Sequence, residues 1–215
     1  KSYLNKNKSD VIYSSDWKLI KKRNAYFYKD QSIVIKLNNK YIHSIGLLDN
    51  LCLAIKIALD LGINKKIITK SIPKIKFEAR IQYLNNGKIV KKLKNNERLL
   101  IDGCHSETSA LNLATYLKTL KTPIYGIWSM TKNKDPDKFI KKFKGLFKKI
   151  IAVPIENESA SLSNKLLFKI AKQNNFDTEV ASNFKNALKK ISSKHKKIIC
   201  IFGSLYLCGS VLNKN

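Results

Sequence analysis

The side chains best suited to chemistry come directly after apolar, β-branched runs. Asp102 and His105 follow the run that starts at Arg98, and Ser204 follows the run that starts at Lys197. A carboxylate, an imidazole and a hydroxyl can bind a polar ligand or assist a proton transfer. Because parallel strands bring such groups together at their carboxyl ends, we expect these side chains at one edge of a sheet.

Sequence motifs for the common catalytic and phosphate-binding sites are missing from the 215 residues. The chain contains no GxxxxGK[ST], no GxGxxG after a strand, no HExxH, no GxSxG and no paired-cysteine metal motif. By elimination, catalysis confined to this chain would depend on Asp102, His105 and their neighbours.

The elements that must position these groups alternate from Glu97 onward. Such alternation predicts right-handed crossovers and a mostly parallel sheet, and hence an α/β domain. Strands are predicted over residues 98–102, 122–129, 149–155, 178–181 and 197–203. Helices are predicted over residues 108–120, 135–147, 163–173, 183–191 and 204–212, with caps at Ser163 and Asn183.

The first 84 residues differ in pattern. Residues 31–37 and 40–45 predict a strand pair, followed by helices over 49–61 and 64–71. So few elements would not make an independent domain with a full sheet. We therefore expect residues 1–84 to be the end of a larger domain and 85–215 to be a second domain. The chain also starts with Lys1 rather than Met, which favours an origin in a longer protein.

The formal charge of +27 indicates attraction to polyanions but no specific nucleic-acid recognition. Of the 42 basic residues only Arg23, Arg80 and Arg98 are arginines, the type that reads bases and clamps phosphates. The lysines are dispersed along the chain. No apolar run could span a membrane, and the four unpaired cysteines favour reduced thiols and a cytoplasmic location.

Several stretches point, as an ordered set, to a known family. In chain order they are Asp49-Asn50-LCLAI, Phe77-EARIQ, Leu100-IDGCH, Lys134-DP, Val153-PIENESASL and Phe202-GSLYLCG. The set resembles the folylpolyglutamate synthase/dihydrofolate synthase branch of the Mur ligase superfamily. The resemblance implies an ATPase domain with a P-loop, of which this chain holds the C-terminal remainder (1–84), followed by a Rossmann-like C-terminal domain (85–215).

The resemblance also implies an activity: ATP-dependent addition of glutamate to folate, as in tetrahydrofolate polyglutamylation, or to dihydropteroate. The carboxylate would react through an acyl phosphate, with ATP and Mg²⁺ as cofactors. The phosphate and metal sites would lie in the N-terminal half, so no metal ligand is assigned here and the chain alone should be inactive. Folate or dihydropteroate, ATP and L-glutamate are the expected partners, and a monomer is the expected state.

Residue by residue, the resemblance assigns nucleotide contacts to Asn50, Arg80 and Asp102. It assigns catalytic positions to Asp102 and His105, and glutamate contacts to His105 and Ser204. Simple structural alternatives stay open for each of them. Asp102 could cap the following helix, His105 could be an ordinary loop residue, Arg80 could pair with Glu78, Ser204 could start a helix, and Asn50 could cap one.

The chain departs from the family pattern at two places. His105 is followed by Ser106 and Glu107 instead of Asn-Pro, and the His-Gln pair expected shortly before Asn50 is missing. Other functions therefore stay open: another amide ligase of the superfamily acting on cell-wall or cyanophycin-like substrates, a basic nucleic-acid-binding α/β module, or a non-catalytic paralogue.

Overall fold

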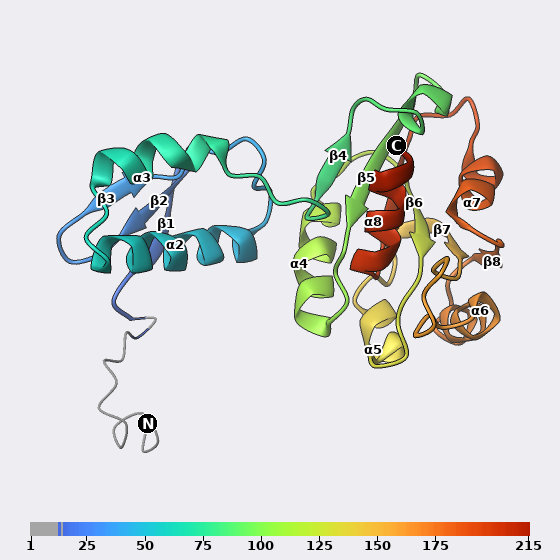
Figure 1. Ribbon diagram of the computed structural model, residues 1–215. Helices are drawn as coiled ribbons and strands as arrows, with labels where there is room; N and C mark the ends of the chain where they lie inside the picture. Colours follow the sequence, from blue (N-terminus) through green and yellow to red (C-terminus); the bar gives the residue numbers. More distant parts are fainter. Residues whose placement is uncertain (1–12, 14) are drawn as a thin grey trace, which may run out of the picture. The chain divides into compact units, whose positions relative to one another are not determined.

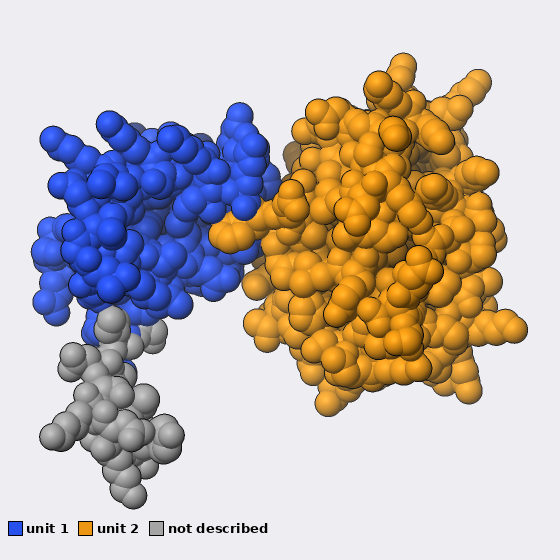
Figure 2. Space-filling model, viewed as in Figure 1, with its two compact units in different colours: residues 1–76 blue, residues 77–215 orange. Residues whose placement is uncertain are grey.

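The computed structural model describes residue 13 and residues 15–215, which form two compact units (Figure 2). Unit 1 covers residues 1–76 and unit 2 covers residues 77–215. Residues 1–12 and 14 of the predicted first domain lie outside the described residues. Unit 2 begins earlier than the boundary predicted after residue 84, because strand β4 (Gln82–Leu84) pairs with a strand of the larger sheet.

Unit 1 combines a small antiparallel sheet with two helices (Figure 1). Its strands are β1 (Lys18–Lys22), β2 (Ala25–Lys29) and β3 (Val34–Lys36), and its helices are α2 (Ile45–Asp60) and α3 (Lys65–Ser71), which runs into a 3-10 turn at Ile72–Lys74. Tyr28 and Ile35 from the sheet, and Leu51, Cys52 and Ile55 from α2, form the centre of its core. This apolar contact holds the helices on the sheet.

Two predictions for unit 1 are wrong. The strand expected over 31–37 is present as β3, but its partner is β2 rather than residues 40–45, and the Asp30 carboxylate accepts backbone N–H groups in the turn between β2 and β3. Residues 40–44 form the approach to α2, which begins at Ile45 rather than Asp49 because Ser44 caps it. The predicted cap of α3 by Asn64 is confirmed.

Unit 2 is built around one mixed sheet in the order β4-β5-β9-β6-β7-β8. The strands after β4 are β5 (Glu97–Asp102), β6 (Ile124–Trp128), β7 (Phe147–Ala152), β8 (Thr178–Val180) and β9 (Lys197–Phe202). β4 is antiparallel to β5, and all the other pairings are parallel. The predicted α/β fold with a mostly parallel sheet is therefore confirmed.

Helices cover both faces of this sheet (Figure 1). One face packs on α4 (Glu107–Lys118), α5 (Pro136–Lys141) and α6 (Asn164–Gln173), and the other on α7 (Phe184–Ile191) and α8 (Leu205–Lys214). The side chains of the central strand β9 alternate between the two cores, as the period of two requires. Because β9 lies between β5 and β6, the carboxyl ends of these three strands are adjacent.

The helix predicted over residues 135–147 is wrong in its second half. α5 ends at Lys141, and Phe147 is the first residue of β7. Phe143 and Phe147 both contact Phe202 of β9, with ring centroids 5.0 and 4.9 Å apart. The aromatic spacing that suggested a longer helix instead serves packing around one side chain, and Gly145, at φ +77°, reverses the chain between them.

Gly203 gives a stability prediction for the turn after β9. Its φ is +101°, and a Cβ there would overlap the carbonyl oxygen of Ser129 and lie 2.7 Å from Trp128 Cδ1. Gly203→Ala should lower the free energy of unfolding by about 2–4 kcal/mol, from backbone strain and overpacking combined. Urea denaturation of the two proteins measures this change in the free energy of unfolding.

Gly209 in α8 is the matched control, because a Cβ there meets no atom within 4 Å. Gly209→Ala should stabilise by about 0.5–1 kcal/mol through helix propensity. Equal effects of the two substitutions would contradict the role given to the turn.

Candidate functional site

Asp102 is the last residue of β5 and is only 4 % exposed. Its two carboxylate oxygens accept separate backbone hydrogen bonds, Oδ2 from the N–H of Ile81 and Oδ1 from the N–H of Cys104, each at 2.8 Å. It does not cap the next helix, because Ser106 caps α4. Asp102 therefore joins the segment before β4 to the turn after β5.

Burial decides the proton affinity of this carboxyl. Removal from water raises the pKa of Asp102 above its usual range, since the charged form loses hydration. The backbone N–H groups of Ile81 and Cys104, and the nearby positive charge of Arg80, oppose that rise. The charge of Arg80 thus acts on the Asp102 carboxyl.

Arg80 lies in a segment with unusual backbone geometry. Ala79 and Ile81, on either side of it, have φ values of +53° and +47°, a region that residues other than glycine rarely adopt and β-branched residues such as isoleucine adopt least. The segment is held by the Asp102 bond to Ile81 and by a 2.8 Å bond from the Gly103 N–H to the Ala79 carbonyl. Strain of this kind occurs where the surrounding structure fixes a conformation, often at functional sites.

The guanidinium of Arg80 lies against the turn after β5. One of its Nη1 hydrogens is donated to the Ala79 carbonyl at 3.1 Å, and a Cβ on Gly103 would lie 2.9 Å from that Nη1. The pairing with Glu78 considered above does not occur between these two described residues. A Cβ at this position would also lie 2.3 Å from Leu205 Cδ2, so Gly103 lets the ends of the Leu205 and Arg80 side chains approach the turn closely.

His105 has a defined ring orientation. Its Nδ1 lies 2.9 Å from the carbonyl oxygen of Gly103, which can only accept, so Nδ1 carries the proton. In the neutral ring Nε2 then has the free lone pair. The backbone N–H of His105 donates to Ser109 Oγ, which also belongs to the capping box with Ser106 at the start of α4. His105 is half-buried and is anchored at both its backbone and its ring.

Ser204 caps α8, as the structural alternative predicted. Its Oγ accepts from the N–H groups of Tyr206 and Leu207, and the residue is 3 % exposed. The hydroxyl proton is not used by these two bonds. Ser204 and His105 both lie just beyond carboxyl ends of strands, on the edge that also holds Asp102.

Asn50 belongs to unit 1 and lies on α2, where it is exposed. It is not a helix cap, because that position is held by Ser44. The structure therefore brings four of the predicted site residues, Arg80, Asp102, His105 and Ser204, to one edge of unit 2, whereas Asn50 is placed only within unit 1.

Two buried polar groups at the same edge were not assigned a role from the sequence. Within the part of the chain that the structure describes, Trp128 Nε1 and Ser129 Oγ are the buried side-chain atoms without a hydrogen-bond partner. Trp128 is the last residue of β6 and Ser129 is the next residue, and both lie next to Gly203. The position of Ser129 at a strand end was the one signal that could have identified this pair.

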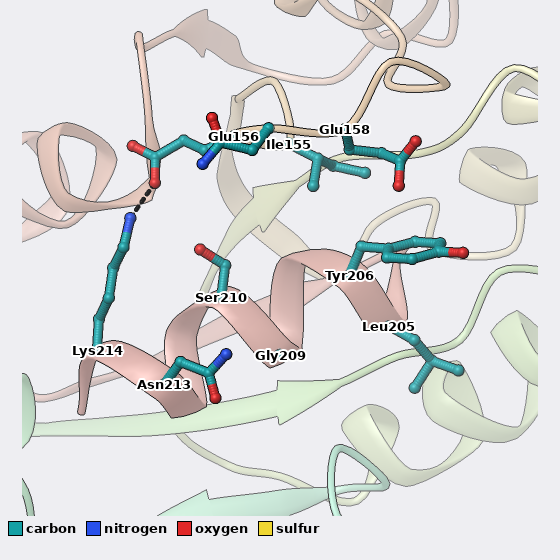
Figure 3. Close-up of a pocket in the computed structure, with 10 residues that line it drawn as sticks. Ile155, Glu156, Glu158, Leu205, Tyr206, Gly209, Ser210, Asn213 and Lys214 are labelled. Atoms are coloured by element: carbon teal, nitrogen blue, oxygen red, sulfur yellow. Dashed lines mark hydrogen bonds and ion pairs between the residues drawn. The ribbon is translucent and has the colours of Figure 1, made fainter.

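A hollow of about 490 Å³ runs along α8 beside this edge (Figure 3). Glu156 and Glu158 line it from the loop after β7, and Tyr206 and Ser210 line it from α8. An ion pair between Lys214 and Glu156 joins its two walls. The loop is part of the stretch Val153-PIENESASL that carried the resemblance, but the sequence did not predict the hollow.

The described residues contain no cluster of potential metal ligands. Among residue 13 and residues 15–215, no group of three or more His, Cys, Asp or Glu side chains could hold an ion. None of the helices in the described part of the chain has the length and apolar character that a bilayer crossing requires.

Comparison with known proteins identifies the class of this Rossmann-like domain. Residues 85–214 match the model of the family described as dihydrofolate synthetase, C-terminal domain. Since the match covers more than half of the chain, the chain belongs to this family. No curated protein sequence matches it.

Solved structures with the same fold extend over almost the whole chain. Folylpolyglutamate synthase of Mycobacterium tuberculosis complexed with ADP has a TM-score of 0.82 at 14 % identity and covers 99 % of this chain and 50 % of its own. Folylpolyglutamate synthase of Thermotoga maritima has a TM-score of 0.73 at 20 % identity, covering 99 % and 49 %. E. coli FolC in complex with DHPP and ADP has a TM-score of 0.73 at 15 % identity, covering 93 % and 46 %. The chain thus spans about half the length of these proteins.

Asp102→Asn tests the structural part of this site. An amide offers one acceptor oxygen where the carboxylate offers two, and its NH₂ group would face the N–H of Ile81 or Cys104. One buried N–H would lose its partner, so the free energy of unfolding should fall by about 1–3 kcal/mol. Chemical denaturation measures the change.

Asp177→Asn is the control, because the Asp177 side chain is 57 % exposed and its ion pair with Lys149 is long, at 3.8 Å. It should change stability by less than about 0.5 kcal/mol. If Asp102→Asn were equally neutral, the carboxylate would not hold the two segments together.

Proposed function

We propose that this chain is the C-terminal portion of a ligase that uses ATP to join glutamate to a folate or dihydropteroate carboxylate. The reaction would pass through an acyl phosphate, which the glutamate amine attacks. The observation that carries the proposal is the convergence of Arg80, Asp102 and His105 around Gly103, in a chain whose residues 85–214 belong to the dihydrofolate synthetase family. The solved relatives named above were bound to ADP in two cases.

The proposal divides the chain by role. Residues 1–84 would be the remainder of the ATP-binding domain, with Asn50 of α2 contacting the nucleotide, and residues 85–215 would be the glutamate-ligase domain. No phosphate-cradling GxxxxGK[ST] occurs in the sequence, and the described residues offer no metal cluster. The Mg²⁺ and phosphate sites are therefore proposed in a preceding half, and the chain alone should be inactive. A cytoplasmic monomer is the proposed state.

Arg80 is the residue proposed to contact phosphate. A guanidinium has five N–H donors in a fixed plane, and the bond to Ala79 uses one of them. The remaining donors suit phosphate oxygens, whose charge they would help to neutralise as the phosphoryl group moves. Asp102 acts on this arginine by fixing the backbone of Ile81 beside it. In this proposal Asp102 positions Arg80 in addition to facing the nucleotide.

His105 and Ser204 are proposed to bind the incoming glutamate. With the proton on Nδ1, Nε2 of His105 can accept a hydrogen bond from the amino group and take up a proton when the amine attacks. The hydroxyl proton of Ser204 is free to be donated to a carboxylate while its oxygen caps α8. Both groups use only atoms that the folded turns leave available.

Arg80→Ala tests the proposed phosphate contact in the full-length enzyme. Ligation of radiolabelled glutamate to dihydropteroate or tetrahydrofolate, with ADP release, is the assay. Loss of a charge that stabilises the transferring phosphoryl group should lower kcat/KM, with a rise of about 1–4 kcal/mol in its activation free energy. The isolated chain is the blank, and we expect no magnesium-dependent ADP release from it.

Arg98→Ala is the matched control, because Arg98 lies on β5, the strand that ends at Asp102, is exposed, and has its guanidinium carbon 4.1 Å from the ring centroid of Tyr83. It removes the same charge and should leave turnover within about twofold. Equal rates for both variants would show that Arg80 does not contact the phosphate. A full-length enzyme that does not ligate glutamate would overturn the proposed function.

His105→Gln tests the glutamate site separately. A glutamine can still form a hydrogen bond but cannot take up a proton from the amine. We expect kcat to fall about 10²-fold or more, the scale of general base catalysis, with the KM for ATP nearly unchanged. His195→Gln, at an exposed position before β9, should have wild-type kinetics. A rise confined to the KM for ATP would instead place His105 at the nucleotide.

A further inference from the structure

A second hollow in unit 2 has a lining of unusual charge. Its volume is about 750 Å³, and its lining contains lysines but neither aspartate nor glutamate. The cationic residues that line it are Lys88, Lys92, Lys94, Lys185, Lys189 and Lys214. We call this feature the lysine pocket. None of the residues assigned above to ATP or glutamate lines it.

The lysine pocket lies between α7 and the segment before β5. Lys94 and Ser192 precede the first residues of β5 and β9, so the pocket reaches the amino ends of the strands. The proposed reaction site is at their carboxyl ends. A strand of six residues is about 20 Å long, which separates the two places.

The charges of the lysine pocket are largely uncompensated. Of the six lysines, only Lys214 has an ion-pair partner among the described residues, namely Glu156. The neighbouring Lys190, which does not line the pocket, pairs with Glu179 at 3.2 Å. Like charges gathered around a concave surface raise the local positive potential and concentrate anions there.

The neutral residues of the pocket indicate which anion fits. Ile89, Leu93 and Leu188 supply apolar surface, and Asn183 and Asn186 supply amide groups. Lysines supply separate point charges, each of which can pair with one carboxylate. The combination matches a flexible chain in which carboxylates alternate with short stretches of methylene.

We propose that the lysine pocket binds an oligo-γ-glutamyl chain, the product tail of a polyglutamylating ligase. The identity of this occupant rests on the proposed function, whereas the anion site itself follows from the lining. Because the pocket is distant from the reacting groups, it would retain a product with several added residues rather than position the carboxylate that reacts. Its affinity should therefore rise with the number of γ-linked residues.

The experiment is a titration of the full-length protein with penta-γ-glutamate, without ATP, followed by calorimetry or by amide NMR shifts. The test variant combines Lys92→Gln, Lys185→Gln and Lys189→Gln. The matched control combines Lys165→Gln, Lys169→Gln and Lys172→Gln on the exposed face of α6, which removes the same charge from the same unit. Free glutamate and a single-stranded RNA of equal charge are the other ligands.

We expect the pocket variant to weaken pentaglutamate binding about tenfold or more, and the α6 variant to change it less than about twofold. Free glutamate should bind too weakly to measure. Equal weakening by the two variants would show general attraction to a chain of charge +27 and would overturn the proposal. It would also be overturned if the pocket variant weakened RNA binding alone.

Binding is measured here without turnover, so its outcome is separate from that of the ligation assay. An enzyme that ligates glutamate but binds pentaglutamate equally in both variants would refute the lysine pocket and leave the proposed function standing. Pocket-dependent binding by a protein without ligase activity would refute the proposed function alone.

Discussion

The carboxylate of Asp102 is the constraint on which the candidate site depends. It accepts the N–H of Ile81 with one oxygen and the N–H of Cys104 with the other, and so fixes two segments that are separated by twenty residues of chain or more. Ile81 is held at a φ of +47°, which an isoleucine would leave without such a bond. The position of Arg80 follows from that backbone, so a buried acid determines where a half-buried cation can act.

The same edge is built from groups that already have structural partners. Ser204 caps α8, the ring of His105 is bonded to the Gly103 carbonyl, and Gly203 allows the turn to pass against Ser129. What is left for a ligand is limited: Nε2 of His105, the hydroxyl proton of Ser204 and the unused donors of Arg80. Groups fixed in this way lose little conformational freedom when a ligand binds, which is the physical basis of preorganisation.

The lysines behind the net charge of +27 have different environments in the structure. Lys197 is buried, donates to the Ile191 carbonyl and lies 3.9 Å from Glu97, so it connects the amino ends of β5 and β9. Lys149 and Lys190 share Glu179 on the surface. The lysine pocket differs from both groups because six lysines and neither aspartate nor glutamate line one hollow. Composition alone could not separate these three cases.

The sequence by itself determined the elements that local rules control: the apolar strands β5, β6, β7 and β9, and the caps Asn64, Ser163 and Asn183. It also placed Asp102, His105 and Ser204 at strand ends, because that depends only on chain order. Tertiary structure decided what depends on distant partners. β4 forms only against β5, and Phe143 and Phe147 leave the predicted helix because both pack on Phe202 and on each other. The left-handed Ile81, the orphaned Ser129 hydroxyl and the lysine pocket are likewise products of long-range contacts, which no periodicity in the sequence encodes.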